Sequence, residues 1–113
     1  MKKILPSKKV CEDFRLTYEL KGAQKGVNVL ARYYRIRGMK IILDGRRVGN
    51  GDKACYNYDG YTAYFSKRGL DKFNVLHEFF HHLVAKGVIE IDEKYEEKAA
   101  DRFAKEVLTR AKC

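Results

Sequence analysis

The segment DKFNVLHEFFHHLVAKG, residues 71–87, contains all three histidines of the chain and its clearest helical pattern. The apolar residues recur at the spacing of one helix face, at Phe73, Leu76, Phe80, Leu83 and Val84. Asp71 is suited to cap the start of a helix, and Gly87 is suited to follow its end. The sequence therefore predicts one helix from about residue 71 to residue 86, with this stripe facing a core.

Two of the histidines lie on one edge of that stripe. His77 and His81 are four residues apart, so their side chains lie one helical turn apart on the same face. Imidazoles placed in this way can share one Zn²⁺ at about 2.0–2.1 Å each. Glu78 is one step round the helix, where it could take a proton from a zinc-bound water. We therefore interpret His77-Glu78-x-x-His81 as a metal-site motif of the H-E-x-x-H type. His82 falls on the far side from the stripe, and we expect it to be mostly exposed to solvent.

A catalytic zinc site commonly has three protein ligands, so a third must come from another segment. Residues 92–110 predict a final helix with several acidic side chains near its start. Periodicity alone leaves Glu96 and Glu97 both open as the third ligand, because both border the buried face. Asp101 favours Glu97, since it lies one turn later on the same side. There it could accept a hydrogen bond from the outer N–H of a zinc-bound histidine.

The first 43 residues suggest further elements. Residues 14–20 alternate apolar and polar side chains, which predicts a strand that Gly22 ends. Residues 23–35 show helical spacing, and residues 39–43 read as a second strand.

The hairpin signal lies at Asp59-Gly60, between runs 54–58 and 61–65 that are rich in tyrosine. Asp-Gly suits the positive φ angles of a type I′ turn. The expected fold class is α+β: a small mixed sheet with an edge hairpin, the H-E-x-x-H helix and a C-terminal helix packed on it.

Composition narrows the class of protein. A chain of 113 residues fits one domain. It has no apolar run of the ~18–20 residues that span a bilayer. The basic N-terminus lacks a long apolar core, so we expect a cytoplasmic protein with no membrane partner. Cys11, Cys55 and Cys113 are far apart, and we expect neither a disulfide nor a cysteine ligand. The net charge of +9 could attract nucleic acid.

The chain resembles the ImmA/IrrE-type zinc metallopeptidases. The resemblance rests on His77-Glu78-x-x-His81 and on the later run ADRFAxxVL, residues 100–108, and it covers about the last 40 residues. The first 70 residues agree with the family only in the order of elements. The resemblance implies that Zn²⁺ is held by His77, His81 and Glu97, that Glu78 is the catalytic base, and that residues 1–113 form a single minimal zincin-like domain. The spacing of Glu97 and Asp101 is also similar to that of gluzincins.

These observations lead us to expect a zinc-dependent endopeptidase in which Glu78 acts as general base. Its substrate would be a protein or peptide, with a helix-turn-helix DNA-binding repressor as the candidate that the resemblance suggests. We expect the 61–65 strand to form the sheet edge that binds substrate. Candidates to stabilise the oxyanion are Tyr64, Tyr95 and His82. The alternative is a basic nucleic-acid-binding protein with a structural or vestigial zinc site.

Overall fold

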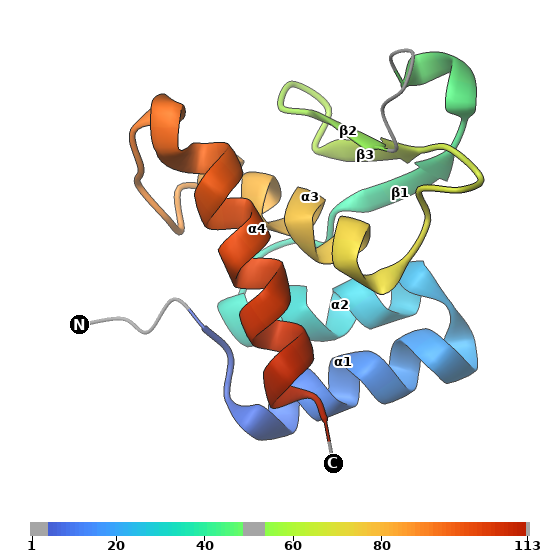
Figure 1. Cartoon of the computed structure of the whole chain (residues 1–113), viewed down its shortest axis with the longest axis vertical. Coiled ribbons are helices and arrows are strands. Elements are labelled where there is room, and N and C mark those ends of the chain that lie inside the picture. The colour runs from blue at the N-terminus through green and yellow to red at the C-terminus, as the bar shows by residue number, and fades with distance from the viewer. Residues whose placement is uncertain (1–4, 49–53, 113) are drawn as a thin grey trace.

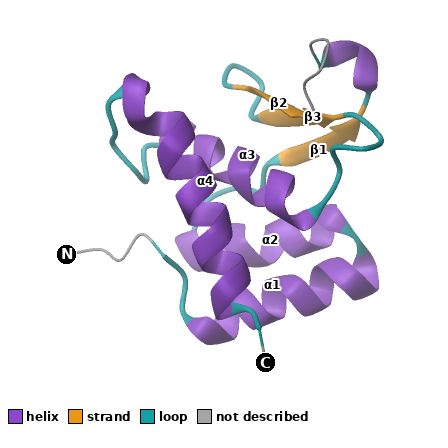
Figure 2. Cartoon of the chain, viewed as in Figure 1, coloured by secondary structure: helices purple, strands orange, loops and turns teal. Residues whose placement is uncertain are grey.

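The computed structural model describes residues 5–48 and 54–112. Over these residues the chain forms four α-helices and a three-stranded mixed sheet, which confirms the α+β class (Figure 1, Figure 2). The elements in order are α1 (Lys8–Lys21), α2 (Ala23–Tyr34), β1 (Lys40–Leu43), the short 3₁₀ helix η1 (Gly45–Arg47), β2 (Ala54–Asn57), β3 (Thr62–Phe65), α3 (Lys72–Ala85) and α4 (Glu93–Arg110). No helix in these ranges has the length and apolar content to cross a membrane.

The sheet has the order β1-β3-β2, so its last strand in sequence is its central strand. β3 pairs in parallel with β1 on one side and antiparallel with β2 on the other. The prediction that the 61–65 strand forms an edge is therefore wrong. The pairing with β1 occupies the second side of β3 and leaves β2 as the edge strand of the hairpin.

The N-terminal segment is a helix, and the predicted strand at 14–20 is wrong. Ser7 caps α1 by accepting a hydrogen bond from the backbone N–H of Val10. Cys11 and Phe14 are the buried residues of this helix, at helical spacing. Leu16 and Leu20, which produced the alternating pattern, are 46% and 80% exposed. The alternation therefore did not mark a buried face.

The hairpin forms as predicted, but its turn differs from the predicted type I′ geometry. The strands end at Asn57 and restart at Thr62, and Tyr61 is the described loop residue with positive φ, at 52°. The Asn57 side chain accepts hydrogen bonds from the backbone N–H groups of Asp59 and Gly60. This side-chain cap supports the turn without left-handed conformations at Asp59 or Gly60.

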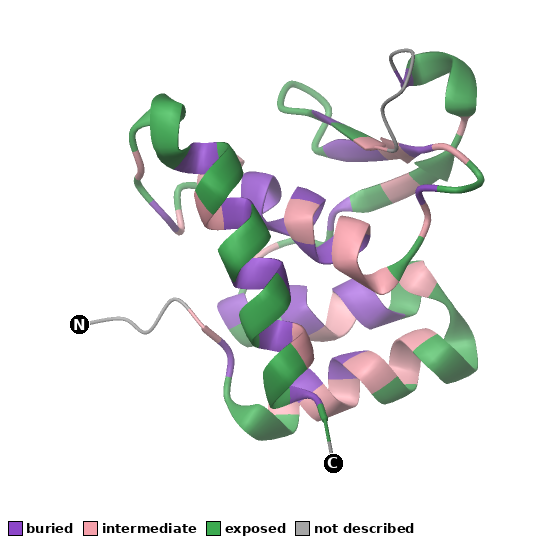
Figure 3. Ribbon diagram, viewed as in Figure 1, coloured by how far each residue is buried: buried purple, intermediate pink, exposed green. Residues whose placement is uncertain are grey.

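Helix α3 lies at the centre of the fold, between the sheet and the α1–α2 pair, and α4 packs along it (Figure 1). Most of α3 is buried, as Figure 3 shows, whereas α1 and α4 each keep an exposed face. Asp71 caps α3 as predicted, since its side chain accepts a hydrogen bond from the Asn74 N–H at 2.8 Å. Because α3 is enclosed by the other elements, its side chains are fixed by packing on several sides.

The close approach of α1 to α2 at Gly26 provides a test of the fold. A Cβ at this position would lie 3.0 Å from Cβ and 3.2 Å from Cα of Tyr18. We expect Gly26→Ala to lower the free energy of unfolding by about 1–3 kcal/mol through overpacking. Helix propensity alone predicts the opposite, a gain of about 1 kcal/mol. Lys25→Ala, on the exposed face beside it, is the control, and chemical denaturation is the measurement. A Gly26→Ala variant more stable than wild type would contradict this packing.

Candidate metal centre

Helix α3 directs two imidazoles towards α4, and one of them, His81, lines a cleft between α3, α4 and the edge strand β2. His77 and His81 approach each other with their Nε2 atoms 3.3 Å apart. The His81 side chain is 7% exposed and the His77 side chain 14%, so both are largely shielded from solvent. The four-residue spacing predicted this shared direction, and the structure confirms it.

Helix α4 contributes a carboxylate to the same point. Glu97 lies with Oε1 3.2 Å from Nε2 of His77 and with Oε2 2.6 Å from Nε2 of His81. These three side chains form a group that could hold a metal ion. The Glu97 side chain is 75% exposed, so the group is open to solvent on the α4 side.

The outer nitrogens of both imidazoles have carboxylate partners on α4. His77 Nδ1 lies 2.8 Å from Oδ1 of Asp101, in the arrangement expected for Asp101. His81 Nδ1 lies 2.5 Å from Oε2 of Glu96. Periodicity left Glu96 and Glu97 open, and the structure separates them: Glu97 faces the Nε2 atoms, whereas Glu96 is buried behind His81. An ionised carboxylate only accepts hydrogen bonds, so Nδ1–H of each histidine donates to its partner on α4, and each Nε2 is directed at Glu97, where a metal ion could bind it.

Glu78 lies beside the group without joining it. Its Oε2 is 4.0 Å from Nε2 of His77, and its side chain is 9% exposed. Burial raises the pKa of the Glu78 carboxyl above its ordinary value, and the nearby imidazoles of His77 and His81 partly oppose that shift. A buried carboxyl with a raised pKa is a better proton acceptor than an exposed one, which suits acid–base chemistry.

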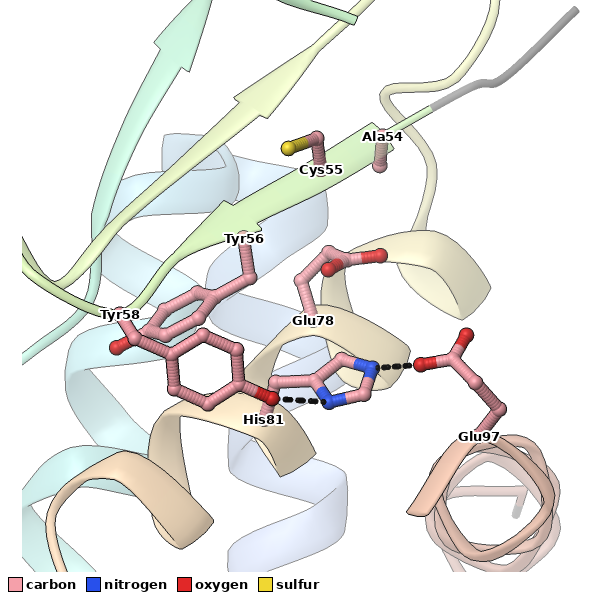
Figure 4. A pocket seen from close by; sticks show the side chains of 7 residues that line it. All are labelled: Ala54, Cys55, Tyr56, Tyr58, Glu78, His81 and Glu97. Atoms are coloured by element: carbon pink, nitrogen blue, oxygen red, sulfur yellow. Dashed lines mark hydrogen bonds and ion pairs between the residues drawn. The ribbon is translucent and has the colours of Figure 1, made fainter. Parts of the chain in front are cut away.

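The cleft in front of the group has a volume of about 250 Å³ (Figure 4). Strand β2 forms one wall, and α3 and α4 form the other. Its lining residues are Ala54, Cys55, Tyr56, Tyr58, Glu78, His81 and Glu97. The wall opposite His81 is therefore formed by β2, an edge strand of the sheet as far as the described residues go.

His82 is fully buried, so the prediction that it is solvent-exposed is wrong. Its Nε2–H donates to the backbone carbonyl of Arg37 at 2.7 Å, and its Nδ1 accepts from the Tyr56 hydroxyl, also at 2.7 Å. Burial lowers the pKa of His82, in keeping with a neutral ring. The sheet packs against the side of α3 that lies away from the apolar stripe, and this packing covers His82. His82 thus joins β2 to the segment before β1.

None of the three residues considered for the oxyanion lines this cleft. Both nitrogens of His82 already have partners. Tyr64 pairs with Cys55 in the β2–β3 ladder and lines a second pocket with Arg47. Tyr95 is exposed on the first turn of α4.

Tyr58, in the tyrosine-rich run 54–58, was not singled out in the sequence analysis. Its hydroxyl donates to Oε2 of Glu96 and lies 3.1 Å from Nδ1 of His81. Burial, with a contribution from Glu96, raises the pKa of this hydroxyl. No local pattern marks the residue, because its partners lie on helices distant in sequence.

No cysteine enters the centre as a ligand over the described residues. Cys11 is buried between α1 and its neighbours, and Cys55, although it lines the cleft, is outside the group that could hold a metal. Neither forms a disulfide within the described part of the chain. Cys113 lies outside the described residues.

Comparison with protein-family models, curated proteins and solved structures finds no match to this chain. The site is therefore interpreted from its own geometry.

The geometry predicts that Glu97, and not an equally charged neighbour, determines metal affinity. We expect Glu97→Ala to weaken Zn²⁺ binding by more than the 10–100-fold that is typical for loss of an outer partner of a ligand. Glu93→Ala is the matched control, because Glu93 is an exposed glutamate one turn earlier on α4. Competition with a chromogenic chelator gives the dissociation constants. Equal constants for Glu97→Ala and Glu93→Ala would contradict the ligand assignment.

Proposed function

We propose that the chain is a zinc-dependent endopeptidase with His77, His81 and Glu97 as metal ligands and Glu78 as general base. The observation that carries the proposal is the convergence of two Nε2 atoms and one carboxylate beside a buried second carboxylate. Ligands of a tetrahedral zinc with bonds of about 2.0–2.1 Å lie about 3.3 Å from one another. The Nε2–Nε2 separation is 3.3 Å and the His77–Glu97 separation is 3.2 Å, whereas the His81–Glu97 separation is shorter, at 2.6 Å, and would have to lengthen around a metal ion.

The donor set favours zinc. Two imidazoles and one carboxylate match the three protein ligands of many catalytic zinc sites, which keep a fourth position for water or substrate. The exposed side of Glu97 and the adjoining cleft provide room for that position. Zinc bound here would supply a Lewis acid that polarises a carbonyl and lowers the pKa of water towards about 7.

The residues of the chain supply the remaining chemistry. Glu78 accepts a proton from the attacking water and returns it to the leaving amine. Asp101 and Glu96 keep the imidazoles of His77 and His81 in the tautomer that directs Nε2 at the metal position. Shielding of Glu78 from bulk water strengthens these interactions.

Strand β2 supports a peptide as the substrate class. An extended peptide can add to the free edge of a sheet through main-chain hydrogen bonds. Over the described residues β2 is an edge strand, and it forms the wall of the cleft facing Glu78 and His81 (Figure 4). A peptide added to β2 would pass in front of the metal ligands. The family resemblance adds a DNA-binding repressor as the candidate protein substrate, and a flexible segment of it would fit this edge.

Glu78→Gln tests the assignment of the base. We expect this variant to bind Zn²⁺ as wild type does and to lose peptide hydrolysis by about 10²–10⁴-fold. The assay uses the full chain with one equivalent of zinc and a quenched fluorescent peptide library. Glu106→Gln, on the exposed side of α4, is the control and should retain full activity. Hydrolysis by Glu78→Gln at the wild-type rate would contradict the role of Glu78.

The alternative function, nucleic-acid binding, is tested by a separate measurement. If the zinc-loaded wild type cleaves no peptide but binds nucleic acid with an affinity that falls steeply with salt, the endopeptidase proposal fails. The site would then be structural in a basic nucleic-acid-binding protein.

A further inference from the structure

The hydroxyl of Tyr58 belongs to a three-membered hydrogen-bond cluster behind the candidate metal position. Tyr58 lies in the loop between β2 and β3, His81 on α3 and Glu96 on α4, so the cluster joins three elements. Oη of Tyr58 and Nδ1 of His81 both contact the same oxygen, Oε2 of Glu96. Figure 4 shows the Tyr58 hydroxyl beside the His81 ring, at the nitrogen that faces away from Glu97.

The chemistry of these groups decides which of them donate to Glu96. A phenol has one proton to donate, and an ionised carboxylate has none. Tyr58 therefore donates to Glu96, and Nδ1–H of His81 donates to the same oxygen. The opposite nitrogen of the ring, Nε2, faces Glu97, whose Oε2 is 2.6 Å away. A histidine that binds zinc through Nε2 makes the same kind of outer hydrogen bond from Nδ1–H.

Burial makes the second donor to Glu96 important. The Glu96 side chain is 9% exposed, so water solvates this carboxylate poorly. A buried carboxylate depends on hydrogen-bond donors to remain in place. Loss of the Tyr58 hydroxyl would leave Nδ1–H of His81 as the remaining donor in this cluster to Oε2. The carboxylate could then rotate away, and its hold on the orientation of the His81 ring would weaken.

The loop that carries Tyr58 is itself anchored. Asn57 caps the backbone on one side of the turn. On the other side, Tyr61 adopts φ of 52°, and its ring lies 3.7 Å from the Nζ of Lys86 at the end of α3. The Tyr56 and Tyr58 rings also pack edge to face, with centroids 5.1 Å apart. These contacts fix the position of Tyr58 over α3.

We propose that Tyr58 is a positioning residue of the metal centre, which acts through Glu96 to hold the His81 ring with Nε2 directed at the metal position. The proposal rests on the metal site of the proposed function, but not on hydrolysis. It makes the hairpin part of the metal centre, although no hairpin residue contributes a ligand atom.

Tyr58→Phe tests this role by removing one oxygen atom from a side chain that is 45% exposed. Long-range ¹H–¹⁵N correlation spectra of the protein loaded with one equivalent of Zn²⁺ report which nitrogen of His81 binds the metal. We expect binding through Nε2 in wild type and a mixture with binding through Nδ1 in Tyr58→Phe. We also expect Zn²⁺ affinity to fall by about 10-fold, the lower end of the effect of an outer partner. The unfolding midpoint should match that of wild type.

Tyr61→Phe is the matched control, because it removes the same atom from the same loop without touching Glu96. It should retain the wild-type spectrum and affinity. A wild-type spectrum and wild-type affinity in Tyr58→Phe would overturn the proposal, and so would equal effects of Tyr58→Phe and Tyr61→Phe. The metal-bound nitrogen is read without substrate, so failure of the peptidase assay would leave this result unaffected.

Discussion

Two hydrogen bonds across the contact between α3 and α4 set the direction of both histidines. Asp101 accepts from Nδ1 of His77, and Glu96 accepts from Nδ1 of His81. Because an imidazole is rigid, fixing one nitrogen also fixes where the other one points. Both acceptors lie on a helix that is packed along α3, which places them more accurately than a loop would. The convergence of the Nε2 atoms with Glu97 depends on this pair of contacts.

The same arrangement gathers negative charge in a basic chain. Glu78, Glu96, Glu97 and Asp101 surround two imidazoles, and they are four of the 15 acidic residues in a chain of net charge +9. Four carboxylates at such separations repel one another, and the repulsion grows as water is excluded. A bound divalent cation would offset that repulsion. The cluster is therefore more readily explained as a cation site than as a solvated helix surface.

The sequence predicted the features that depend on local spacing. The extents of α3 and α4, their caps and the pairing of His77 with His81 all follow from contacts within one or two helical turns. Prediction from the sequence failed where contacts between distant segments determine the structure. The alternation at Leu16 and Leu20 did not face a core. His82 and Tyr58 owe their surroundings to contacts between the hairpin and the helices, which no local pattern encodes. Likewise, β3 pairs with β1 as well as with β2, so the edge strand beside the cleft is β2 and not the predicted 61–65 strand.

X-ray absorption at the zinc edge tests the central claim, that His77, His81 and Glu97 bind one zinc ion, most directly. The full chain would be loaded with one equivalent of Zn²⁺ and freed of excess metal. The account predicts a first shell of nitrogen and oxygen at about 2.0–2.2 Å, with the outer-shell scattering of two imidazoles. A sulfur ligand at about 2.3 Å would contradict the account, because it would place the metal on a cysteine. Failure of the chain to retain zinc would contradict it equally.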